Sequence, residues 1–128
     1  MLNLFKNKQK PQPAPAPTQK KNDESKRFVV FEQAASFNGM EKIQLTIGRY
    51  QPTLDGIAAL KKAKPDGNYE KIEFRPIESG GWSLFVDGFR AGAIFTPEDD
   101  PKNFEEVCVR MEQRKGEDRP YLYARMRK

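Results

Sequence analysis

The sequence of 128 residues contains no histidine and only one cysteine, Cys108. Histidine is the commonest general base and, with cysteine, the usual zinc ligand, so Ser-His and Cys-His hydrolases and structural zinc sites are excluded. A lone cysteine cannot form a disulfide within the chain, which argues against a cross-linked secreted scaffold. A Mg²⁺ or Ca²⁺ site made of carboxylates stays open.

Long apolar runs are also missing. No segment approaches the roughly 20 apolar residues that a membrane-spanning helix needs, and residues 1–10 lack the apolar core of a signal peptide. We therefore expect no membrane span and a cytoplasmic protein.

Charge is distributed unevenly along the chain. Residues 1–27 hold seven Lys/Arg and two Asp/Glu, a net of +5; residues 28–113 hold ten and fourteen, a net of −4; residues 114–128 hold six and two, a net of +4. Basic ends on an acidic body suit a polyanionic partner such as nucleic acid, although runs of charge are often only solvated.

Two parts of the chain differ in composition. Residues 1–26 are basic and rich in Pro and Ala, with proline at every second position from Pro11 to Pro17. Such a segment is extended and cannot bury enough apolar area to order itself, so we predict a disordered arm. Residues 27–128 carry the apolar patterns of a single folded domain.

Six segments of the domain have the composition or alternation of β-strands. The Asp87-Gly88 pair between two of them is a strong hairpin signal, so three consecutive segments should form a meander. The six predicted strands are Phe28–Phe31, Lys42–Ile47, Tyr69–Ile77, Trp82–Val86, Phe89–Phe95 and Tyr121–Arg127.

Two segments have helical spacing. Leu54–Ala63 follows Thr53, a possible N-cap, with Leu54, Ile57, Ala58 and Lys61 on one face. Phe104, Val107, Cys108 and Met111 follow the i, i+3, i+4, i+7 pattern after Asp100 and Pro101, which suit a helix start. The predicted fold is α+β: a strongly curved or barrel-like antiparallel sheet of about six strands with two helices.

Catalytic machinery is not recognisable in this sequence. Glu98-Asp99-Asp100 could hold a hard cation, but acidic residues at a helix start are favoured there by the helix dipole, which is the reading we prefer. Cys108 lies on an apolar face and is expected to be an inert core residue. We therefore predict no enzyme activity, no metal and no cofactor.

Aromatic and basic residues alternate near the C-terminus. Tyr121 and Tyr123 should share one strand face with Arg119, Arg125 and Arg127, and Arg49-Tyr50 forms a second pair at the end of another strand. Single-stranded nucleic acid is held by this combination, since bases stack on rings while cations meet phosphates. An ordinary solvent-exposed strand face would have the same sequence pattern, so both interpretations stay open.

The order of elements over 48–127 resembles the HIRAN domain, a small module found in DNA-repair helicases and alone in bacteria and phages. The matching segments are Gly48-Arg49-Tyr50, Ile72–Pro76, the hairpin Trp82–Ile94 and the stretch Phe104–Arg114. The resemblance implies a barrel-like fold that grips the 3′ end of single-stranded DNA. Because Glu78–Gly81 replaces the family's polar segment, only Arg49 and Tyr50 carry over as contacts to DNA.

The sequence thus predicts a module that binds nucleic acid, single-stranded DNA or DNA ends first, through the six residues Arg49, Tyr50, Tyr121, Tyr123, Arg125 and Arg127. The alternative is a phage-derived protein-interaction or adaptor module without catalytic activity, with a protein partner held through the N-terminal arm. Its oligomeric state is left open.

Overall fold

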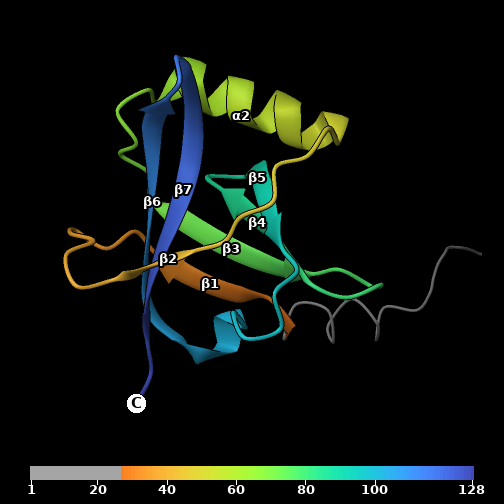
Figure 1. Ribbon diagram of the computed structural model, residues 1–128, viewed down its shortest axis with the longest axis vertical. Helices are drawn as coiled ribbons and strands as arrows, with labels where there is room; N and C mark the ends of the chain where they lie inside the picture. The colour runs from red at the N-terminus through yellow and green to blue at the C-terminus, as the bar shows by residue number, and fades with distance from the viewer. Residues whose placement is uncertain (1–26) are drawn as a thin grey trace, which may run out of the picture.

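The computed structural model describes residues 27–128, and the predictions made for residues 1–26 lie outside them. One α-helix, one 3₁₀ turn and seven strands make up this part of the chain (Figure 1). In chain order they are β1 (Val29–Glu32), β2 (Glu41–Ile43), α2 (Gln51–Ala63), β3 (Lys71–Pro76), β4 (Trp82–Val86), β5 (Phe89–Ile94), η2 (Pro101–Asn103), β6 (Phe104–Arg114) and β7 (Glu117–Met126).

The strands form two mainly antiparallel sheets, in the orders β1-β3-β4-β5 and β2-β7-β6. The predicted meander of β3, β4 and β5 is confirmed, and its Asp87-Gly88 turn has positive φ at both residues (49° and 89°), as a two-residue hairpin turn requires. The pairing of β1 with β3 stops at Phe74, so Pro76 has a strand neighbour on one side only.

Two isolated bridges connect the sheets. Gln33, just after β1, pairs with Val107 of β6, and Thr46, after β2, pairs with Ala93 of β5. The ladders are otherwise separate, so within residues 27–128 the sheets do not close into a barrel. The α+β class and the antiparallel pairing are confirmed; the predicted barrel-like sheet is replaced by two facing sheets.

The apolar core lies between the two sheets. From the first sheet it takes Ile72, Phe74, Leu84 and Val86, and from the second Val107, Val109 and Leu122, all fully buried. Edge-to-face contacts of Phe74 with Phe31 and Phe104, at centroid distances of 6.0 and 5.7 Å, continue the core towards η2. Alternating strand residues therefore supply this core from both sides.

The second predicted helix is wrong, because Phe104–Arg114 is strand β6. Its pairing with β7 shifts register so that Glu105 is an extra residue between Phe104 and Glu106. This bulge puts Phe104 and Val107 on the same buried side, three residues apart, and so imitates a helical pattern. Asp100 does act as a cap, accepting the Lys102 N–H at 2.9 Å, but the element it caps is η2.

The first predicted helix is confirmed as α2, with corrected details. It begins at Gln51, one residue after Tyr50, so Thr53 lies inside the helix and is not its N-cap. The buried side chains are Thr53, Ile57 and Leu60 with Gly56, whereas Leu54 is 38% exposed. A Cβ at Gly56 would lie 2.0 Å from the Arg90 carbonyl oxygen, so glycine lets α2 pack directly on β5.

The predicted strand over Lys42–Ile47 is shorter in the structure. Only Glu41–Ile43 pairs with β7, and the chain then turns across to the Thr46 bridge. Leu45 packs onto Gly92 at this crossing, where a Cβ would come within 2.7 Å of the leucine side chain. Over residues 27–128 no helix is long and apolar enough to traverse a bilayer.

Candidate nucleic-acid interface

The six predicted contact residues lie on two regions of the surface. Tyr121, Tyr123 and Arg125 point away from the core on β7, since the alternate residues Leu122 and Ala124 are fully buried. Arg127 follows β7 and is exposed. The remaining two, Arg49 and Tyr50, are exposed and directly precede α2.

Tyr121 lies between cations. The Lys42 ammonium lies 4.4 Å and the Arg114 guanidinium 5.3 Å from the centroid of its half-buried ring. Both distances are within the range of cation–π contacts. The arrangement concentrates positive charge around an aromatic ring, which is what a base and its adjoining phosphates would meet.

Tyr123 is far less accessible, with 9% of its surface exposed. Phe37 covers its ring at a centroid distance of 4.8 Å, and its hydroxyl donates to Glu112 Oε2 at 2.5 Å. Burial, followed by this hydrogen bond, raises the pKa of Tyr123 to about 12. Its geometry suits a support for the neighbouring residues better than a stacking surface.

Arg125 is engaged away from Tyr121. Its Nε lies 3.6 Å from Glu106 Oε1, and its Nη2 donates to the Asn38 carbonyl oxygen at 3.4 Å. Arg127 is held through its backbone N–H, which donates to the Asn103 carbonyl oxygen near η2. Both arginines therefore lie towards the η2 end of β7, and the structure does not bring them to Tyr50.

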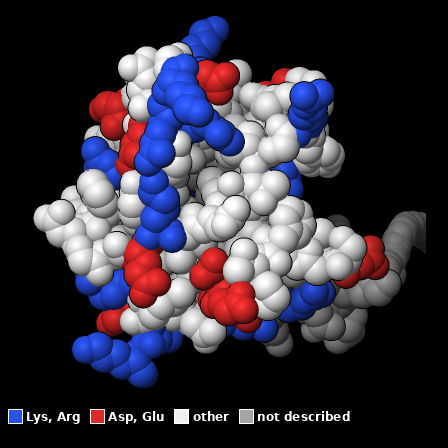
Figure 2. Space-filling view, in the orientation of Figure 1, with Lys and Arg blue, Asp and Glu red and all other residues white. Residues whose placement is uncertain are grey.

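Sequence reasoning missed several cations beside Tyr121. Lys42 arrives through the pairing of β2 with β7, and Arg110 and Arg114 through the pairing of β6 with β7. With Arg119 of β7, these exposed residues form what we call the basic band: Lys42, Arg110, Arg114 and Arg119. Figure 2 shows Lys and Arg atoms running along the face where Figure 1 shows β7.

Tyr50 lines a separate hollow of about 400 Å³, which lies between the segment before α2 and strand β5. Tyr50 is 58% exposed, and the Arg90 guanidinium lies 4.7 Å from the centroid of its ring. Arg90 is fixed by Ser83 Oγ at 3.1 Å and by Thr53 Oγ1. Phe95, 55% exposed, lines the same hollow, so two open rings and a held cation meet there.

The segment between β2 and α2 connects the two regions. A hollow of about 300 Å³ beside Tyr121 is lined by Lys42, Leu45 and Ile47, and Ile47 also lines the hollow at Tyr50. Figure 1 shows this segment crossing from β2 to the start of α2. Ile47 thus borders both the hollow beside Tyr121 and the hollow at Tyr50, whereas Arg125 and Arg127 line neither.

Cys108 and the acidic residues near Asp99 were considered above as possible chemical sites. Cys108 is buried in β6, and burial raises the pKa of its thiol. Among residues 27–128 no cluster of three or more His, Cys, Asp or Glu side chains is placed to hold a metal ion. Asp99 is half-buried, and burial, followed by the charges of Glu98 and Glu41, raises its pKa.

Comparison with known proteins gives no relative on which to base a function. No protein-family model, curated protein or solved structure matches the chain.

Proposed function

We propose that the chain binds single-stranded nucleic acid, with DNA strands or DNA ends as the first choice. The observation that carries the proposal is that Ile47 borders two hollows, one beside Tyr121 and the cations around it and the other at the exposed Tyr50. Stacking on aromatic rings and neutralisation of phosphates are the two contributions that such binding needs.

Each part of the surface has a distinct role in this proposal. Arg90 covers one side of the Tyr50 ring, and Tyr50 is exposed, so a base would stack on the other side. One stacked base contributes about 1–3 kcal/mol. The four cations of the basic band would follow the phosphates, and Arg49, exposed beside Tyr50, would extend that contact.

Salt dependence and charge reversal test the proposal together. Anisotropy of a labelled single strand of about 12 nucleotides should show affinity falling steeply between about 50 and about 200 mM salt. Lys42→Glu, which reverses a charge in the basic band, should weaken binding and flatten that dependence. Lys102→Glu is the matched control, because Lys102 is exposed on η2, outside the band.

Two results would contradict this function: no binding at low salt, or equal losses in the two variants. The alternative is a protein-interaction module that holds its partner through the N-terminal arm, residues 1–26. An adaptor would still bind its protein partner in the Lys42→Glu variant but would lose it when residues 1–26 are deleted. A nucleic-acid binder would keep most of its stacking energy after that deletion.

A further inference from the structure

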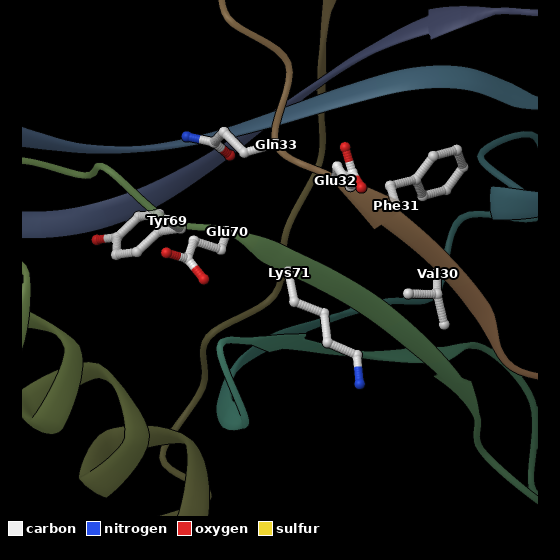
Figure 3. Close-up of a pocket in the computed structure, with 7 residues that line it drawn as sticks. All are labelled: Val30, Phe31, Glu32, Gln33, Tyr69, Glu70 and Lys71. Carbon is white, nitrogen blue, oxygen red and sulfur yellow. The ribbon is translucent and has the colours of Figure 1, made fainter.

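Strands β1 and β6 each lie at an open edge of their sheet. They pair with each other only at the bridge between Gln33 and Val107. Before that point a groove of about 630 Å³ separates them, lined by Val30 and Glu32 on one side and by Glu105 and Glu106 on the other. A second hollow lies along β1 where it passes Tyr69 and Lys71 (Figure 3).

The backbone of Val30 faces this groove. Gln33 N–H donates to Glu70 beside β3, and the next N–H, from Ala34, donates to Val107 on β6. Backbone groups of an antiparallel strand alternate between its two sides. Val30, three residues before Gln33, therefore points its N–H and C=O away from β3, where no strand of residues 27–128 pairs with it.

Acidic side chains surround the groove. Glu32, Glu105 and Glu106 line it and are exposed. Among the lining residues from 27–128 the single cation is Arg125, which already contacts Glu106. Unpaired edge strands are sites where an extended peptide adds as a further strand. The charge of this edge favours an extended peptide with flanking lysines.

Residues 11–18 of this chain have that character. Prolines occupy positions 11, 13, 15 and 17, whereas Gln12, Ala14, Ala16 and Thr18 keep their N–H groups. In an extended chain alternate residues point to the same side, so all the donors lie along one edge and all the prolines along the other. Residues before proline also favour extended backbone, which lowers the entropy lost on ordering.

We propose that residues 11–18 add to the groove edge of β1 as a further strand, with Ala14 and Ala16 directed at the backbone of Val30. Lys10 and Lys20 flank this segment and match the acidic groove. Residues 19–26 connect it to Arg27, and eight residues span up to about 26 Å. This reach exceeds the length of β1, whose four residues extend about 13 Å. The connection is therefore long enough for residues 11–18 to lie beside β1.

Amide hydrogen exchange of the full chain tests this inference. The Val30 amide should exchange about ten-fold more slowly in the wild type than in the Ala14→Pro, Ala16→Pro variant, which loses the donors facing β1. The matched control is Pro13→Ala, Pro15→Ala, which changes only the opposite edge and should keep the Val30 protection. The Phe31 amide, which faces β3, should be unchanged in both variants.

Three results would overturn the inference. The Val30 amide could exchange equally in the wild type and in the Ala14→Pro, Ala16→Pro variant, or the control could lose as much protection as that variant. Protection that falls on dilution would instead indicate that the segment docks on a second copy of the chain. None of these readouts involves nucleic acid, so the test is independent of the proposed function.

Discussion

The side-chain amide of Gln33 forms a reciprocal pair of hydrogen bonds with the backbone of Val109. Gln33 Oε1 accepts the Val109 N–H at 2.8 Å, and Gln33 Nε2 donates to the Val109 carbonyl oxygen at 2.9 Å and to the Gly67 carbonyl oxygen at 3.0 Å. One side chain thus replaces a strand neighbour for β6. It connects the edge of the first sheet to the edge of the second at the point where their own pairing ends.

Replacing Gln33 by alanine should destabilise the domain by about 2 kcal/mol, because it leaves three backbone groups without their partner in a partly buried position. Urea unfolding followed by tryptophan fluorescence measures the change. Gln113→Ala is the control, since Gln113 is an exposed glutamine on β6, and it should stay within about 0.5 kcal/mol of the wild type. Equal losses in the two variants would show that the amide does not join the sheets.

The sequence predicted those parts of the fold whose signals are local. The Asp87-Gly88 turn and the alternation of Ile72 and Phe74 were sufficient for the meander, and the spacing of Ile57 and Leu60 for α2. Phe104–Arg114 was missed because its bulge at Glu105 breaks the two-residue period. In retrospect, the β-branched Val107 and Val109 and the Lys115-Gly116 turn, with φ of 53° and 80°, were the signals of a hairpin.

The candidate site was predictable only where its residues are close in sequence. Tyr50 and Tyr121 were identified from their neighbouring arginines. Lys42 and Arg114 meet Tyr121 through strand pairing, and pairing with a segment interpreted as a helix could not be foreseen. The cover that Phe37 places over Tyr123 likewise depends on how the loop between β1 and β2 folds back.

Removal of the Tyr69 hydroxyl and removal of the Tyr123 hydroxyl should change the stability of the domain in opposite directions. The Tyr69 hydroxyl is buried and has no hydrogen-bond partner among residues 27–128, so Tyr69→Phe should stabilise the domain by about 1 kcal/mol. Tyr123→Phe should destabilise it by about 1 kcal/mol, because it removes the hydrogen bond to Glu112. Urea unfolding at neutral pH compares the two variants, and changes of the same sign would contradict the assignment.

The same pair of tyrosines should govern stability in alkali. The pKa of Tyr69 is raised to about 12 by burial and then by Asp66 and Asp87, and the pKa of Tyr123 is raised to about 12 by burial and the bond to Glu112. Because both folded values lie above the unfolded value of 10, ionisation of either phenol disfavours the fold, so stability is unaffected by these groups below pH 10 and declines as pH rises towards 12. The double phenylalanine variant should show a flatter decline over this range.

Asp87 should control stability in acid. Burial acts to raise its pKa, but the Lys71 and Glu70 N–H groups and the Lys64 ammonium outweigh it, so the pKa is lowered. A depressed folded pKa gives stability that is present above the unfolded value and is lost as pH falls through the folded one.

Asp87→Asn should therefore be less stable than the wild type at pH 7 and should lose less stability on acidification below the ordinary aspartate value of about 3.9. Asparagine tolerates the positive φ of this turn position, so the comparison isolates the charge. Asp118→Asn, at an exposed site on β7, serves as control. Parallel acid-unfolding curves for the wild type and Asp87→Asn would refute the role.

Tyr50 should contribute more to nucleic-acid affinity than an equally apolar exposed ring elsewhere. Tyr50→Ala removes the ring of a residue that is 58% exposed and contacts Arg90, and the affinity for a single strand should fall about ten-fold, within the range of one lost stacking contact. Phe89→Ala is the matched control, because Phe89 is 40% exposed and does not line the Tyr50 hollow. Its affinity should stay within about two-fold of the wild type.

Since stacking is electrostatically neutral, the slope of affinity against salt should be the same in Tyr50→Ala and the wild type. A change in that slope, or equal losses for the two rings, would mean that Tyr50 acts through something other than stacking.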